Sequence, residues 1–146
     1  MVKFLDLNKQ YESIKSDIDA AIASVISDTA FIGGKYVKQF EADFAEYCGV
    51  KYCLGVGNGT DALEMAIESL GLPSNSEIIV PANSFVASSE AVTRSGHKVV
   101  FADINPDNYT LSPASVESLI TANTSAIMAV HLYGHPCDMD ALKGLA

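Results

Sequence analysis

The chain has 146 residues, a length typical of one domain, and 49% of them are apolar while 18% are charged. This balance is typical of a packed globular core and excludes a disordered chain. Eighteen acidic and nine basic residues give a net charge of −9, which argues against non-specific nucleic-acid binding because such binding depends on neutralising phosphates.

The first third of the chain is predicted to form two helices. Apolar residues recur at spacings of three and four from about Gln10 to Ser27 and again over Lys35–Cys48, and Gly49 is the expected stop of the second helix. We expect both apolar stripes to face a core. The stripes are Tyr11, Ile14, Ile18, Ile22 and Val25 in the first helix, and Val37, Phe40, Phe44 and Tyr47 in the second. Between the helices, two adjacent glycines predict a turn with unusual backbone angles at Phe31, Ile32, Gly33 and Gly34.

From residue 50 onward, short apolar runs alternate with helical segments. Strands are expected at Val50–Val56, Glu77–Val80, Lys98–Ala102 and Ser125–Val130. Helices are expected at Thr60–Leu70, Phe85–Ser95 and Pro113–Thr121, and from about Asp138. This alternation favours an α/β fold in which helices cover a parallel sheet, and the four strands resemble part of a larger sheet.

The clearest chemical signal is the glycine-rich stretch Gly55–Leu63, which lies between a predicted strand and a predicted helix. A helix start exposes unpaired N–H groups and a partial positive charge, so it can hold a phosphate, and Thr60 adds a hydroxyl. Asp61 and Glu64 have the spacing of a capping pair. The spacing equally fits a turn that only caps its helix. It matches neither a Walker A loop nor the GxGxxG pattern.

Cysteine and histidine positions predict neither a disulfide framework nor a metal site. Cys48, Cys53 and Cys137 are odd in number and form no CxxC pair, so we expect free thiols in a reducing cytosol. The polar cluster from His131 to Asp138 is interrupted by glycine and proline, which argues against helical metal-ligand spacing. We find no targeting segment or membrane span, and a cytoplasmic location is expected.

Several separated motifs, in a common order, resemble the N-terminal part of the DegT/DnrJ/StrS family. These proteins are sugar aminotransferases with the aspartate-aminotransferase type (fold type I) of pyridoxal phosphate fold. The resemblance implies a partial large domain with a mostly parallel sheet flanked by helices. The motifs are Phe4-Leu5-Asp6-Leu7, Phe31-Ile32-Gly33-Gly34, Phe40-Glu41, Tyr47-Cys48-Gly49-Val50, Gly57-Asn58-Gly59-Thr60-Asp61-Ala62-Leu63, Val80-Pro81-Ala82-Asn83-Ser84-Phe85-Val86-Ala87-Ser88, Val100-Phe101-Ala102-Asp103-Ile104 and Val130-His131-Leu132-Tyr133-Gly134.

The resemblance implies roles for particular residues. Gly59, Thr60 and Asp61 match the family's cradle for the cofactor phosphate. Phe85 matches the aromatic residue that stacks on the pyridine ring; without the resemblance, a core aromatic at a helix start would be the preferred interpretation. The loop that reaches the substrate and the subunit interface is matched by Phe31, Ile32, Gly33 and Gly34.

The resemblance also implies a function for the intact protein. Residues 1–146 would be the N-terminal portion of the cofactor-binding domain, inactive alone, with the Schiff-base lysine beyond Ala146 and the C-terminal domain absent. The intact protein, a homodimer, would use pyridoxal 5'-phosphate to transfer an amino group from an amino acid donor, glutamate, to a nucleotide-linked keto-sugar. The alternatives are a sugar dehydratase of the same fold, with histidine in place of the lysine, and a non-catalytic regulatory or dimerising relative. No nucleic-acid or membrane partner is expected.

Overall fold

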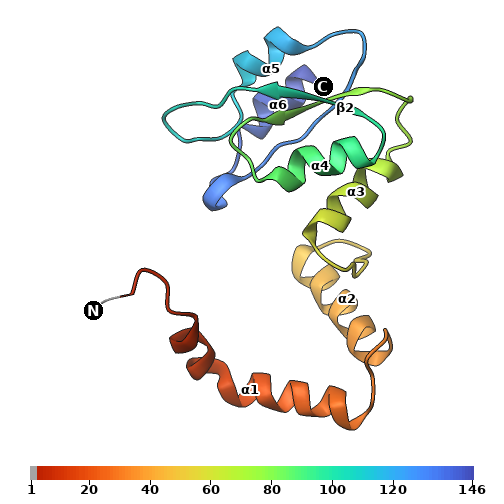
Figure 1. Ribbon diagram of the computed structural model, residues 1–146, viewed down its shortest axis with the longest axis vertical. Helices are drawn as coiled ribbons and strands as arrows, with labels where there is room; N and C mark the ends of the chain where they lie inside the picture. The colour runs from red at the N-terminus through yellow and green to blue at the C-terminus, as the bar shows by residue number, and fades with distance from the viewer. Residues whose placement is uncertain (1–2) are drawn as a thin grey trace. The chain divides into compact units, whose positions relative to one another are not determined.

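The computed structural model describes residues 3–146 and divides into two compact units, Met1–Gly55 and Val56–Ala146. Figure 1 shows helices in the first unit, and a sheet with helices in the second. No helix within residues 3–146 combines the length and apolar character needed to cross a lipid bilayer.

The first unit contains helices α1 (Leu7–Ser27) and α2 (Lys35–Cys48). Helix α1 begins three residues before its predicted start because the Asp6 carboxylate caps it, accepting the amide of Lys9 at 3.1 Å. Helix α2 has its predicted bounds, and Gly49 ends it in the left-handed conformation with φ 64°. Local capping chemistry therefore sets the start of α1 and the end of α2.

The expectation that the apolar stripes of α1 and α2 face a core is wrong for this unit. Ile22 is 54% exposed and Phe40 is 54% exposed, and Ala45 is the buried residue of α2. Phe40 and Phe44 stack on one another with ring centroids 5.5 Å apart. The two helices thus carry amphipathic faces whose apolar side chains remain largely accessible to solvent, as is typical of surfaces that a partner covers.

The second unit is built on a parallel sheet of strands β1 (Glu77–Pro81), β2 (Lys98–Ala102) and β3 (Thr124–Ile127) in the order β2-β1-β3. Helices α3 (Gly59–Ser69) and α4 (Val86–Arg94) cover one face, and helices α5 (Pro113–Leu119) and α6 (Met139–Leu145) cover the other, as Figure 1 shows. The α/β prediction of a parallel sheet flanked by helices is confirmed. A 3₁₀ turn, η1, spans Leu132–Gly134.

The central strand β1 organises a core on each face of this sheet. Ile78 and Val80 point to the side of α3 and α4, while Ile79 points to the side of α5 and α6. All three are almost completely buried. A strand that is buried on both faces has a continuous apolar sequence, and residues 78–81 of β1 show that pattern.

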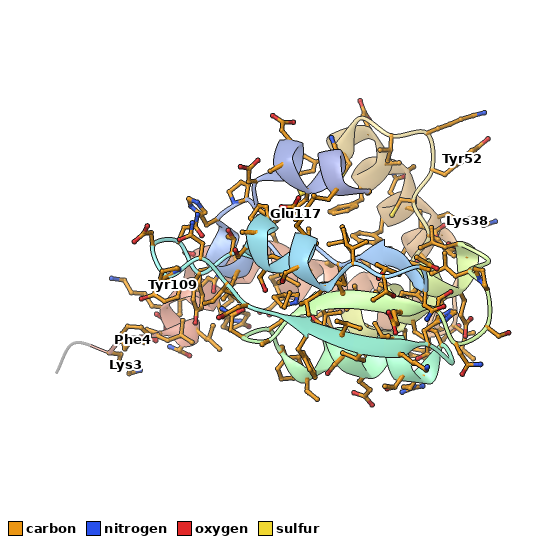
Figure 2. All side chains as sticks on the ribbon, turned by 90° about the horizontal axis from the view of Figure 1, so that it is seen from above. Lys3, Phe4, Lys38, Tyr52, Tyr109 and Glu117 are labelled. Carbon is orange, nitrogen blue, oxygen red and sulfur yellow. The ribbon has the colours of Figure 1, made fainter. Side chains whose placement is uncertain are left out.

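The predicted strand Val50–Val56 does not form. Residues 52–56 have no strand pairing. The run has strand-like composition, but a strand requires a neighbouring backbone as hydrogen-bond partner. The Glu41 carboxylate of α2 instead accepts the amide of Gly55 at 2.8 Å, whereas the amide of Val50 belongs to the C-terminal cap of α2 and donates to the Ala45 carbonyl at 3.0 Å. Tyr52 projects outward and is 77% exposed (Figure 2).

Candidate functional site

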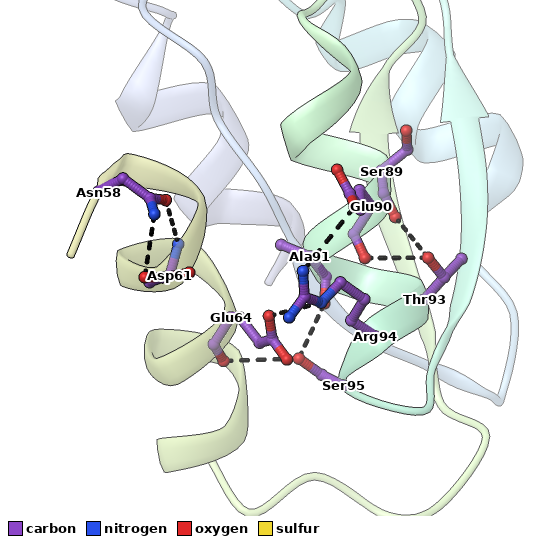
Figure 3. Close-up of polar contacts among 9 residues, drawn as sticks. All are labelled: Asn58, Asp61, Glu64, Ser89, Glu90, Ala91, Thr93, Arg94 and Ser95. Atoms are coloured by element: carbon purple, nitrogen blue, oxygen red, sulfur yellow. Dashed lines mark hydrogen bonds and ion pairs between the residues drawn. The ribbon is translucent and has the colours of Figure 1, made fainter. Parts of the chain in front are cut away.

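The glycine-rich turn leads into the first turn of α3. Asn58 is the N-cap residue, in an extended conformation, and its Oδ1 accepts the amide of Asp61 at 3.0 Å (Figure 3). The Asn58 carbonyl accepts the amide of Ala62 at 3.1 Å. Within residues 3–146, the amides of Gly59 and Thr60 donate to no protein group. These two N–H groups, at the positive end of α3, are the donors left for a ligand.

Asp61 serves the cap with its side chain as well as its amide. Its Oδ2 accepts a hydrogen bond from Nδ2 of Asn58 at 3.0 Å, so the predicted capping pair of Asp61 and Glu64 is wrong and the pair is Asn58 and Asp61. A Cβ on Gly57 would lie 2.7 Å from the same Oδ2. Gly57 therefore gives the Asp61 carboxylate the room it needs to fold back onto the turn.

Glu64 instead joins α3 to α4. Its carboxylate lies 2.9 Å from Nε of Arg94, and Glu90 lies 3.9 Å from the same guanidinium. Figure 3 shows these groups between the two helices. Because the guanidinium is half exposed, the pair contributes little stability, about 0–1 kcal/mol. Its consequence is geometric: the helix that carries the glycine-rich turn is tied to the helix that follows Phe85.

Phe85 lies after the carboxyl end of β1, at the N-cap position of α4, with extended angles of φ −63° and ψ 148°. Its ring is 76% exposed. The interpretation of Phe85 as a core aromatic is therefore wrong. Open α/β sheets bind ligands at the carboxyl ends of their strands, where Phe85 lies. That Phe85 borders the same pocket as Thr60 stays a prediction.

The turn before Phe85 is fixed by a contact that the local sequence pattern does not indicate. Nδ2 of Asn83 donates to the carbonyl of Tyr109 at 3.1 Å, although the two residues are 26 positions apart. Tyr109 has a positive φ of 60°. The loop that follows β2 is thereby tied to the turn that follows β1, at the same edge of the sheet.

The cluster from His131 to Asp138 forms a compact turn after β3. Nδ1 of His131 accepts the amide of Cys137 at 3.1 Å, and the buried Cys137 thiol donates to the carbonyl of Val130 at 3.2 Å. One ring nitrogen of His131 is thus engaged by the backbone. Within residues 3–146 no group of three or more His, Cys, Asp or Glu side chains is placed to hold a metal ion.

The loop Phe31–Gly34 belongs to the first unit and presents an apolar tip. Ile32 is almost fully exposed, and both Gly33 and Gly34 have a positive φ. The base of the loop is closed by the Asp28 carboxylate, which lies 2.7 Å from Nζ of Lys35 and accepts the hydroxyl of Tyr36 at 2.6 Å. The Lys35 ammonium, followed by the Tyr36 hydroxyl, holds the pKa of Asp28 below its ordinary value of 3.8.

We expect this loop to open in acid. A carboxylate whose pKa is lowered in the folded chain stabilises the folded chain at any pH above the ordinary pKa. This stabilisation is lost as the pH falls through the lowered pKa. NMR titration of the Asp28 carboxyl carbon from pH about 6 to about 2 should give a midpoint below 3.8, with amide shifts of Gly33 and Gly34 following it. The Asp28→Asn variant should show no such transition; a midpoint at or above 3.8 would contradict the closed base.

Residues 12–146 match the DegT/DnrJ/EryC1/StrS aminotransferase family over most of the chain. The chain belongs to this family. It is 44% identical, over 99% of its own length, to the dTDP-3-amino-3,4,6-trideoxy-alpha-D-glucose transaminase of Streptomyces venezuelae. The chain spans 38% of that relative.

Two solved structures align with the chain. The structure of S. venezuelae DesV in complex with a ketimine intermediate has a TM-score of 0.93 at 44% identity, covering 99% of this chain and 39% of DesV. The structure of the E. coli GDP-4-keto-6-deoxy-D-mannose-3-dehydratase with bound hydrated PLP has a TM-score of 0.80 at 33% identity, covering 86% of this chain and 34% of the dehydratase. The fold is therefore part of the fold type I architecture predicted from the motifs.

Proposed function

We propose that residues 1–146 form the N-terminal portion of the cofactor-binding domain of a pyridoxal phosphate-dependent enzyme that aminates a nucleotide-linked keto-sugar. The observation that carries the proposal is the start of α3, with two unengaged amides in a family whose solved members bind this cofactor. The amino donor is proposed to be glutamate, the assembly a homodimer and the location the cytoplasm. The Schiff-base lysine and the C-terminal domain are proposed to lie outside these residues.

The residues of the turn fit a phosphate group. The amides of Gly59 and Thr60 and the Thr60 hydroxyl offer hydrogen-bond donors at the N-terminus of α3, where the helix dipole favours an anion. The Asp61 carboxylate is the group that would repel a phosphate. Its engagement by Nδ2 of Asn58 keeps it folded back on the turn. The proposed cradle thus consists of Gly59 and Thr60. Asp61 completes it through its hydrogen bonds with Asn58, the N-cap residue of α3.

When bound, pyridoxal phosphate supplies an electron sink for cleaving and forming bonds at the carbon that bears the amino group. The residues of this chain would hold the cofactor and orient it. Gly59 and Thr60 bind the phosphate end, which fixes the position of the molecule. The exposed face of Phe85 offers a flat apolar surface against which an aromatic ring can be held at low entropic cost.

A titration of the 146-residue chain tests this proposal. In ¹⁵N NMR, both inorganic phosphate and pyridoxal phosphate should shift the amides of Gly59 and Thr60. Phe85→Ala should weaken the affinity for pyridoxal phosphate roughly fivefold and leave the affinity for inorganic phosphate unchanged, because only pyridoxal phosphate carries a ring that can stack. Phe101→Ala, another exposed aromatic of the same unit, should change neither affinity.

Two results would contradict the proposal. One is the absence of any phosphate-dependent shift at Gly59 and Thr60. The other is a stoichiometric adduct with pyridoxal phosphate on one specific lysine of this chain, trapped by borohydride and located by peptide mapping, together with transamination. That result would place the catalytic lysine within residues 1–146.

A sugar dehydratase is the second candidate, because the chain aligns with the E. coli dehydratase structure at 33% identity. The two activities are proposed to differ at the position of the Schiff-base lysine, where a dehydratase has histidine. The same phosphate cradle and the same stacking surface at Phe85 serve either reaction. Identifying that residue in the longer protein would decide between them.

A further inference from the structure

The strand order marks one place on the sheet of the Val56–Ala146 unit. Strand β1 pairs in parallel with β2 on one side and with β3 on the other. The chain therefore leaves β1 toward one edge of the sheet and later passes β1 to reach the opposite edge. In open α/β sheets, ligands bind at the carboxyl ends of the two strands between which the connections switch direction. In this unit those strands are β1 and β3.

Each of the two strands is followed by a side chain that can contact a ligand. Phe85 follows β1 and His131 follows β3, and both are exposed. The backbone beyond β3 still runs along β1, since the amide of Met128 donates to the carbonyl of Ile79 at 2.8 Å. Because the strands are parallel, both residues lie at the same end of the sheet, where Figure 1 shows the turn before α4 and the 3₁₀ turn η1.

Two contacts with Cys137 hold the His131 ring. Nδ1 of His131 accepts the amide of Cys137 at 3.1 Å, and the buried Cys137 thiol donates to the carbonyl of Val130 at 3.2 Å. A ring nitrogen that accepts a hydrogen bond carries no proton, so the neutral imidazole carries its proton on Nε2. Among residues 3–146, no protein group accepts a hydrogen bond from this Nε2. His131 thus offers a fixed N–H donor that has no acceptor of its own.

A donor of this kind can bind only certain groups of a pyridoxal ring. The ring carries a phosphate arm, a pyridine nitrogen and a phenolic oxygen, in addition to the carbon that reacts. The phosphate is proposed to bind the amides of Gly59 and Thr60. A protonated pyridine nitrogen is itself a donor and cannot accept from an N–H group. The phenolate oxygen can accept, and a hydrogen bond to a charged acceptor is stronger than one between neutral groups.

We propose that His131 is a further ligand-binding residue of this site, and that its Nε2–H group donates a hydrogen bond to the phenolate oxygen of the pyridoxal ring. The inference rests on the proposed function, since it adds a residue to the same site. Because the contacts with Cys137 fix the imidazole before a ligand arrives, the side chain loses little freedom on binding.

The test uses the full 146-residue chain and two probes, pyridoxamine phosphate and its 3-O-methyl ether. Neither probe has an aldehyde that could react with lysines, and the ether has no phenolate. His131→Asn removes the Nε2 donor and keeps a side-chain oxygen that can accept the amide of Cys137. This variant should bind pyridoxamine phosphate roughly tenfold more weakly than the wild type in an NMR titration, and its affinity for the ether should be unchanged.

Two other variants and one spectrum complete the test. His131→Gln carries an amide N–H group near the position of Nε2 and should restore part of the affinity for pyridoxamine phosphate. His135→Ala removes an exposed histidine from the same loop and should bind both probes as the wild type does. In ¹⁵N spectra of the free wild type, the His131 ring should carry a proton on Nε2 and none on Nδ1.

The outcomes separate a ligand contact from a structural role. If His131→Asn binds pyridoxamine phosphate as tightly as the wild type, then His131 serves only to hold the loop and the inference is wrong. A loss of affinity that is equal for the two probes, or a proton on Nδ1, would also overturn the inference alone. A wild type that binds neither probe would overturn the proposed function and this inference together.

Discussion

Replacing Ile79 with alanine is expected to lower the free energy of unfolding of the Val56–Ala146 unit by about 2–5 kcal/mol. Ile79 lies in the central strand β1 and is completely buried. It contacts the core formed on the side of α5 and α6. Neighbours on both flanking strands limit how far the site can collapse, because Ile79 pairs with Val100 of β2 and Ile127 of β3. Most of the cavity should therefore persist.

Urea denaturation followed by far-ultraviolet circular dichroism and by hydrogen exchange at the β1 amides measures this loss. Ile120→Ala is the matched control, because Ile120 is 40% exposed at the end of α5 in the same unit. The control should lose less than about 1 kcal/mol. A loss below about 1 kcal/mol for Ile79→Ala would contradict the assignment of β1 as the centre of the core.

Most helices and strands could be predicted because their signals are local. The bounds of α2 and of β2 match the expected ones, since Gly49 stops the helix and the run Lys98–Ala102 is short and apolar. The placement of the glycine-rich turn before α3 follows from the same kind of signal. The family itself was indicated by the order of the motifs, and the match of residues 12–146 confirms it.

What the sequence could not indicate depends on residues far apart in the chain. The run Val50–Val56 has the composition of a strand, but composition does not say whether a partner strand exists, and here the Glu41 side chain of α2 accepts the amide of Gly55. The spacing of Asp61 and Glu64 suggested a cap, yet Glu64 pairs with Arg94 on another helix. The apolar stripes of α1 and α2 show which face is apolar and not what covers it.

The cap at Asn58 changes how many donors the phosphate turn offers. The resemblance to the family assigns the phosphate cradle to Gly59, Thr60 and Asp61, which would offer three amides. The amide of Asp61 is engaged by Oδ1 of Asn58, so the amides of Gly59 and Thr60 remain. With fewer donors, each contributes a larger share of the affinity. Removing one of them should therefore have a large effect.

Replacing Gly59 with proline is expected to weaken phosphate binding about 10- to 100-fold while leaving α3 intact. Proline lacks the N–H group, and a hydrogen bond to a charged acceptor contributes about 1.5–3 kcal/mol. The helix should tolerate the change because Gly59 is its first residue, the position at which proline is favoured. The chain already has this arrangement at Pro113, the first residue of α5.

The local backbone also accommodates a proline at this position. The preceding residue, Asn58, is extended with φ −166° and ψ 176°, as a residue before proline prefers. A Cβ on Gly59 would meet no atom within 4 Å. Gly59→Ala is the matched control, since it adds a Cβ and keeps the N–H group, and its phosphate affinity should stay within about threefold of the wild type. Titration with inorganic phosphate, read at the Thr60 amide, measures the affinity, and circular dichroism measures the helix. If Gly59→Pro keeps both its helix and its full affinity for phosphate, then the Gly59 amide is not a phosphate donor and the proposed cradle is wrong.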